Sequence, residues 1–233
     1  MILELIMNGS SASFAETLIL ILLTLITAFF SIILREYVKD RITVKLGGYA
    51  APSLNPFARP IVSDLFSAAI LTVFSGSWVK AKNPVLSRGK TVVAALSAPI
   101  TNLLVAFVSI FLYDVLRLID VAIYTNSESH PLILIWISII FSTCVLVNIA
   151  YAIFDILPIP GTNGGIILSC FLPEKTAEIF LSFDKFSYII LLFIIIVAAR
   201  SGVTAAAVDA VADFMETPFV ALSNLLFPVQ INY

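Results

Sequence analysis

Two long apolar runs constrain this chain more than any other feature of its sequence. Residues 14–34 carry one charged side chain, Glu16, near their start, and residues 131–154 carry none. At 1.5 Å per helical residue, each run reaches at least about 30 Å, the thickness of a bilayer's hydrocarbon core. Charged residues make up 12% of the sequence, about half the share typical of soluble domains. The runs therefore predict an all-α membrane protein, because a spanning helix satisfies its own backbone hydrogen bonds.

Further apolar segments indicate that the chain crosses the membrane several times. Residues 91–113 and 186–199 are strongly apolar, and residues 65–79 form a shorter run. We expect a polytopic bundle of about five to six transmembrane helices, built as one membrane-embedded domain over residues 1–233. The milder segment 203–233 is expected to lie on the membrane surface or to pack across the bundle.

The connections between these runs contain helix-breaking residues. Residues 42–60 are rich in Gly and Pro and alternate weakly, which predicts short strands or a re-entrant segment after the first helix. Pro99 predicts a kink or break in the helix expected over 91–119. Residues 124–131 are polar and predict a loop. The basic loop 77–90 favours the cytoplasmic side by the positive-inside rule.

Composition and motifs exclude several classes of function. No nucleotide, haem or nucleic-acid motif is present, and the net charge of −2 indicates no particular partner. Cys144 and Cys170 lie in or beside apolar segments, so we expect free thiols. The first apolar run is too long for a signal peptide and lacks a cleavage site of small residues.

Four stretches with unusual polar, Pro and Gly content follow one another along the chain. They are REYVK at 35–39, DRITVKLGGYAAPSLNP at 40–56, SAPITN at 97–102 and NIAYAIFDILPIPGTNGG at 148–165. In this order they resemble the motifs of the site-2 protease family of intramembrane zinc metalloproteases. The fourth is the most specific, because it is similar to the family's pattern asparagine, then phenylalanine-asparagine-leucine-leucine-proline-isoleucine-proline, then aspartate-glycine. The resemblance covers about residues 31–168 and implies a site-2-protease-like bundle.

The resemblance also implies a zinc site whose ligands are missing here. In the family, histidines stand at the positions of Arg35 and Lys39, an aspartate at Asn163, and the general-base glutamate at Glu36. Arg has no lone pair to donate to a metal, Lys39 could donate only when deprotonated, and Asn163 offers a weak neutral oxygen. The sole histidine, His130, lies in a distant loop. We therefore expect no metal, no cofactor and no catalytic residue, and hence a chain that is not an enzyme.

Arg35 and Lys39 lie one helical turn apart, on one face of their helix. Our hypothesis is that they supply the positive charge that zinc supplies in the family, with Glu36 or Asp155 as the negative partner. The simpler interpretation is that these charges belong to the solvated end of a transmembrane helix.

The family's substrate cleft has counterparts in this sequence. The resemblance implies a candidate peptide or partner groove at Asn102, Asn148, Pro158, Pro160 and Gly164. The simpler interpretation of the two asparagines is interhelical hydrogen bonding. We expect the glycines at 47, 48, 164 and 165 to serve turns or close approach of two backbone segments.

The sequence thus predicts a catalytically inactive pseudoprotease that acts as a scaffold or partner-binding subunit of a membrane complex. Its expected partners are the lipid bilayer and other membrane proteins or a transmembrane helix, with no nucleic acid. One alternative is an active intramembrane peptidase with rearranged chemistry, using Glu36 with Asp40 or Asp155. Another is a transporter or channel component. The expected location is a bacterial-type inner membrane.

Overall fold

The computed structural model describes residues 14–55, 85–127 and 130–226, and within them every regular element is a helix. The helices, in chain order, are α2 (Phe14–Lys45), α4 (Arg88–Ser127), α5 (Leu132–Ile156), α6 (Asn163–Phe171), α7 (Glu174–Ser182), the short 3-10 helix η2 (Phe183–Phe186), α8 (Ser187–Ser201) and α9 (Val203–Leu226). The all-α prediction is confirmed for this part of the chain.

Three of the described helices are long and apolar enough to cross a membrane. The candidate spans are Glu16–Lys45 in α2, Arg88–Thr125 in α4 and Leu132–Ile156, which is the whole of α5. These three helices indicate an integral membrane protein. The predicted run at 186–199 is helical, but the 15 residues of α8 reach only about 22 Å. The run at 65–79 lies outside the described residues, so five to six spans stay a prediction.

The segment after the first long helix differs from its prediction in the described part. Residues 42–45 complete α2 instead of leaving it, and Gly47 turns the chain with a φ of 90°. From there to residue 55 the chain has neither helix nor strand. In this last part of the helix, Thr43 Oγ1 donates a hydrogen bond to the Lys39 carbonyl one turn earlier. The predicted strands are therefore absent from 42–55, and residues 56–60 lie outside the described part.

Pro99 does not break its helix. α4 runs through it as one helix of 40 residues and ends at Ser127, beyond the predicted end at 119. Hydroxyl groups around Pro99 bond the same turns, since Ser97 Oγ donates to the Ala94 carbonyl and Thr101 Oγ1 donates to the Ser97 carbonyl. Neither bond involves the Ala95 carbonyl, which is the one that loses its N–H partner at Pro99. The polar residues 124–127, predicted as loop, also belong to this helix.

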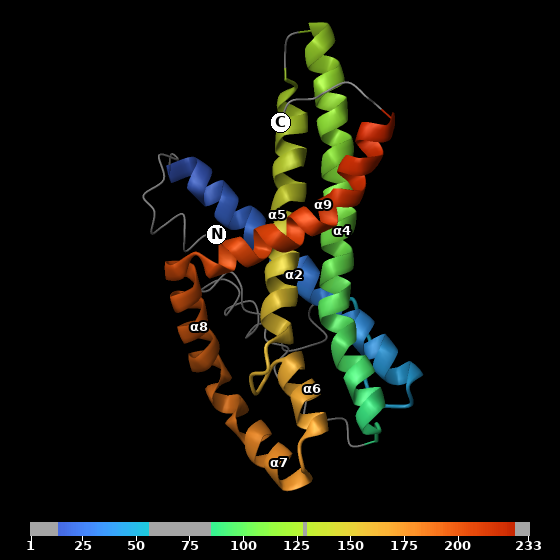
Figure 1. The fold of residues 1–233 in the computed structure, drawn as a ribbon, viewed down its shortest axis with the longest axis vertical. Helices are drawn as coiled ribbons and strands as arrows, with labels where there is room; N and C mark the ends of the chain where they lie inside the picture. The colour runs from blue at the N-terminus through green and yellow to red at the C-terminus, as the bar shows by residue number, and fades with distance from the viewer. Residues whose placement is uncertain (1–13, 56–84, 128–129, 227–233) are drawn as a thin grey trace.

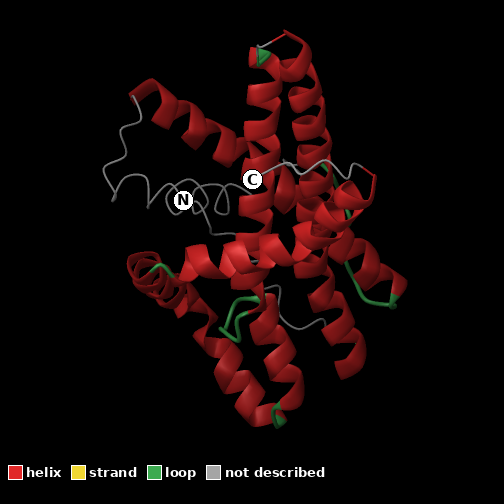
Figure 2. Ribbon diagram, turned by 45° about the horizontal axis from the view of Figure 1, so that its top comes forward, coloured by secondary structure: helices red, strands yellow, loops and turns green. Residues whose placement is uncertain are grey.

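The centre of the fold is a long pair formed by α4 and α5, which lie side by side (Figure 1). α2 crosses this pair on one side and packs through Ala28 and Ile32 against Val147 and Tyr151 of α5. α6 continues below α5, and α7 and α8 lead back to the start of α9 (Figure 1). Figure 2, coloured by secondary structure, shows these helices and the loops that connect them, with no strand among the described residues.

The tail segment forms a helix that packs across the bundle, the second of its two predicted arrangements. α9 crosses α5 and α4 (Figure 1). Its contact joins Val208 to a cluster of Ala106 and Ile110 from α4 with Val145 and Ile149 from α5. Small and β-branched side chains let the three helices approach closely, as in other membrane bundles.

Replacing Ile149 with Ala tests this packing. Ile149 is fully buried where α4, α5 and α9 meet, so its loss leaves a cavity that costs about 2–4 kcal/mol. The same change at Ile140, which is 43% exposed on the same helix, should change stability by less than about 0.5 kcal/mol. Thermal unfolding in mild detergent measures both, and equal shifts would contradict the described packing.

Candidate functional site: a buried charge network

Arg35 and Lys39 lie on the face of α2 that is turned into the protein. Ile32 lies one turn before Arg35 on this face, and Ala28 lies two turns before it. Residues at positions i, i+4 and i+7 share one face of a helix, so Arg35 continues the line of Ala28 and Ile32. Arg35 is 1% exposed, and Lys39 is partly exposed one turn further on. The helix therefore carries its charged residues into the interior, and the interpretation of a solvated helix end is wrong for Arg35.

The end of α5 brings a carboxylate to Arg35. Asp155 is 3% exposed, and its Oδ2 lies 4.0 Å from Arg35 Nη1. On the other side of the guanidinium, Glu36 Oε1 lies 3.5 Å from Arg35 Nε. Tyr151, one turn before Asp155, places its ring 5.7 Å below the guanidinium carbon. Arg35 is thus held between two carboxylates and one aromatic face.

The first residue of α6 connects Lys39 to Asp155. Lys39 Nζ donates a hydrogen bond to Asn163 Oδ1 at 2.6 Å, and Asn163 Nδ2 donates to Asp155 Oδ2 at 2.7 Å. The backbone N–H of Asn163 also donates to Asp155 Oδ1, at 3.2 Å. Because this N–H opens a helix, Asp155 gains the favourable interaction of an anion with a helix N-terminus.

Charge balance explains why this arrangement is tolerated inside the protein. The network contains two cations, Arg35 and Lys39, and two anions, Glu36 and Asp155. Buried charges are stable only when they are paired and hydrogen-bonded. We call these four residues with Asn163 the charge network. It joins α2 to the end of α5 and the start of α6, which lie more than a hundred residues further along the chain.

The loop before α6 has a conformation that fixes Asn163. Gly161 has a φ of 97°, which favours glycine. Thr162 caps α6, since its Oγ1 accepts a bond from the Gly165 N–H at 3.0 Å and donates to the Ile159 carbonyl at 2.9 Å. A Cβ at Gly164 would overlap the Ile156 carbonyl oxygen. This contact matches the expectation that glycines here serve close backbone approach.

The residues of the charge network do not fit a zinc ion. A guanidinium donates no lone pair, the Lys39 ammonium is engaged with Asn163, and the Asn163 amide bonds Asp155 on its other side. Within the described residues, no three His, Cys, Asp or Glu side chains gather to hold a metal. His130 lies at the opposite end of α5 from Asp155. Its Nδ1 is 2.8 Å from Asp120 Oδ2, and its ring stacks on Tyr124.

The residues of the candidate groove are mostly buried in this conformation. Asn102, Asn148, Pro160 and Gly164 are buried, and Pro158 is exposed. Asn148 Nδ2 bonds the Cys144 carbonyl of its own helix at 2.8 Å, and the Asn102 amide has no hydrogen-bond partner among the described residues. Neither asparagine side chain makes an interhelical hydrogen bond among the described residues, so this interpretation stays a prediction. The groove itself stays a prediction.

Two residues near Arg35 differ from what the sequence predicts: Tyr151, which contacts it, and Asp40, which lies outside the charge network. Tyr151 was not singled out, although its position one turn before Asp155 puts both on one face of α5. Asp40 is buried at 4% exposure on α2, but none of the contacts that make up the charge network involves it. Cys170 is buried and Cys144 partly buried, and both are free thiols, as predicted.

No family model, no curated protein and no solved structure matches this chain. The function must therefore be argued from the four sequence motifs and from the chemistry of the charge network.

Replacing Asp155 with Asn tests the charge network. The change leaves Arg35 with Glu36 as its remaining carboxylate and should destabilise the protein by about 3 kcal/mol, because a buried cation loses an anion. Glu36→Gln should have a smaller effect, since this side chain is 17% exposed. Glu178→Gln, on the exposed face of α7, is the matched control. Chemical unfolding in detergent measures all three, and an unchanged midpoint for Asp155→Asn would contradict the network.

Replacing Gly165 with Ala tests the loop. An added Cβ would overlap the Ile159 carbonyl oxygen, and the backbone of Pro160 lies next to it, so we expect a loss of about 3 kcal/mol. Gly89→Ala is the control, because a Cβ there meets open space in a helix and should be neutral or stabilising by up to about 1 kcal/mol. Similar melting temperatures for the two variants would show that the loop can relax.

Proposed function

We propose that this chain is a catalytically inactive, site-2-protease-like membrane protein that serves as a scaffold or partner-binding subunit of a membrane complex. The observation that carries the proposal is the meeting of positions 35, 39 and 163. These are the positions that the resemblance assigns to zinc ligands, and Lys39 Nζ lies 2.6 Å from Asn163 Oδ1. Arg35 lies 4.0 Å from Asp155, to which Asn163 is hydrogen-bonded, so the three positions share one network although position 163 is more than a hundred residues from the other two.

Arg35, Lys39 and Asn163 replace all three zinc ligands that the resemblance implies. This supports a role in which the membrane fold is kept and the catalytic activity is lost. Lys39 and Asn163 contact each other directly, and Arg35 reaches the same Asp155 that Asn163 bonds. An ion-pair network can join α2, α5 and α6 without a metal, because its charges balance. A chain of this kind retains its membrane fold and can present surfaces to partners. The bacterial-type inner membrane is part of the same proposal, through the family resemblance.

The chemistry of Glu36 argues against the alternative of a peptidase with rearranged chemistry. A general base needs a water or substrate proton within hydrogen-bond reach. Glu36 Oε1 is directed instead to Arg35 Nε, at 3.5 Å. Asp155 is likewise engaged, by two bonds from Asn163. These contacts compete with the binding of a water by either carboxylate, which supports the inactive alternative.

Restoring the three ligands tests the proposal directly. The variant R35H/K39H/N163D places two imidazoles at i and i+4 opposite a carboxylate, which is a catalytic zinc arrangement. We expect the purified variant to retain about one equivalent of zinc after dialysis and the wild type less than about a tenth, as measured by mass spectrometry of metals.

The matched control is the variant R35H/K39H/N163A, which lacks the third ligand and should bind zinc at least about tenfold more weakly. Equal zinc retention by wild type and triple variant would contradict the assignment of these positions. Zinc in the wild type would instead support an active metalloenzyme. A stoichiometric membrane protein that co-purifies with the wild type would identify the complex that it serves.

A further inference from the structure

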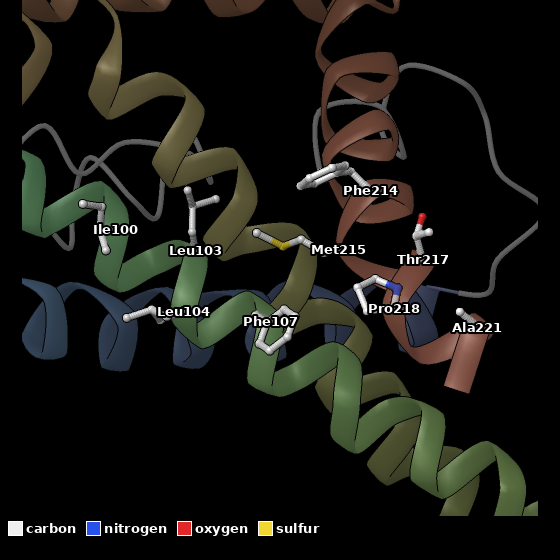
Figure 3. A pocket seen from close by; sticks show the side chains of 9 residues that line it. All are labelled: Ile100, Leu103, Leu104, Phe107, Phe214, Met215, Thr217, Pro218 and Ala221. Carbon is white, nitrogen blue, oxygen red and sulfur yellow. The ribbon is translucent and has the colours of Figure 1, made fainter. Parts of the chain in front are cut away.

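An apolar groove lies between α4 and α9. Its volume is about 550 Å³. The α4 wall carries Ile100, Leu103, Leu104 and Phe107, and the α9 wall carries Phe214, Met215, Thr217, Pro218 and Ala221 (Figure 3). Leu104 is 59% exposed and Phe214 is 80% exposed. The groove is therefore open to the surroundings of the protein. Thr217 carries the only hydroxyl group among the residues that line it.

The α4 wall of the groove belongs to the stretch that is expected to cross the hydrocarbon core. Residues 91–113 of α4 contain no charged side chain and reach about 35 Å, which is enough to cross the bilayer. The groove residues 100–107 occupy the middle of this stretch. α9 crosses α4 and α5 at this level, because Phe219 contacts Phe107 and Phe111, with ring centres 5.0 and 5.5 Å away.

The outer face of α9 does not suit hydrocarbon. Its inner face packs through Val208, Met215 and Phe219, whereas Asp209 and Asp213 are exposed on the other side. Neither aspartate has an ion-pair partner among the described residues, and α9 contains no basic residue. A carboxylate in the centre of a bilayer costs about 2.5–3.5 kcal/mol. In hydrocarbon, this face would be stabilised by a partner that supplies positive charge.

The two aspartates belong to the same stripe of α9 as the groove. Asp209, Asp213, Thr217 and Ala221 follow one another at intervals of four residues, so they form one line along the helix. The line passes from charged to apolar, and its last two members line the groove. An occupant that fits this surface is apolar where it meets the groove and positively charged one or two turns away.

We propose that this surface binds a transmembrane helix of another membrane protein that carries Lys or Arg within its apolar stretch. The basic side chains pair with Asp209 and Asp213, and an apolar side chain of the same helix enters the groove beside Leu104 and Phe214. Each partner then removes the other's charge from lipid, which favours association inside the bilayer. This inference rests on the proposed role as a partner-binding subunit and assigns that role to α9.

A synthetic helix tests the proposal in lipid nanodiscs that contain the full chain. The probe is a leucine-alanine helix of about 22 residues with two lysines four residues apart near its middle, labelled for energy transfer. We expect it to bind at least about tenfold more tightly than the same helix without lysines. D209N/D213N should remove this difference, and Ala221→Trp should weaken binding by filling the groove. Glu178→Gln and Leu132→Trp, exposed elsewhere, are the matched controls.

A charge-reversal variant distinguishes a loss of binding from a loss of folding. D209K/D213K should lose the lysine helix and gain a helix with two glutamates at the same positions. Equal binding of the charged and neutral helices, or binding of neither, would overturn the proposal and leave lipid chains as the occupant. Energy transfer between two differently labelled copies of the chain that D209N/D213N abolishes would overturn it in favour of a second copy. The zinc measurement on R35H/K39H/N163D does not involve α9, so the two proposals can fail separately.

Discussion

A guanidinium group that is 1% exposed inside a membrane protein needs a counter-ion, and Arg35 has this need. The structure meets it with Asp155, which the Asn163 N–H and amide hold in place. Removing one partner of a buried ion pair is far more costly than never having the pair. The position of α2 against α5, and of α6 below them, therefore depends on this interaction. The loop 157–162 follows from the same requirement, because it must return the chain to Asp155 within a few residues.

A metal ion and an ion-pair network can hold the same three segments together, but they do so with different chemistry. Zinc gathers ligands around one strong positive charge and leaves a position for water. Arg35 and Lys39 distribute the positive charge over two side chains: Lys39 donates a hydrogen bond to Asn163, and Arg35 forms ion pairs with Glu36 and Asp155. Such a network leaves no Lewis acid, and its carboxylates are engaged. The membrane scaffold that we propose requires only that the fold persist, together with outer surfaces such as the acidic face of α9.

The comparison of sequence and structure shows which patterns carry long-range information. Apolar length located α2, α4 and α5, because each helix satisfies its backbone by itself. Local rules failed at two places: the helix continues through Pro99, and the Gly/Pro-rich segment begins after Lys45 rather than at 42. The burial of Asn102 without a hydrogen bond, and the role of Tyr151 beneath Arg35, had no local signal strong enough to predict them.

The sequence by itself determined the helical class, the membrane character of the long runs and the identity of the charges at 35, 36, 39 and 155. These follow from side-chain chemistry and from the period of a helix, which act within a few residues. Only the tertiary structure decided that Lys39 meets Asn163, that Asp155 rather than solvent faces Arg35, and that α9 crosses α4 and α5 with its aspartates outward. These contacts join residues up to 124 positions apart, and their partners are selected by packing and charge balance across the whole fold, which no local pattern contains.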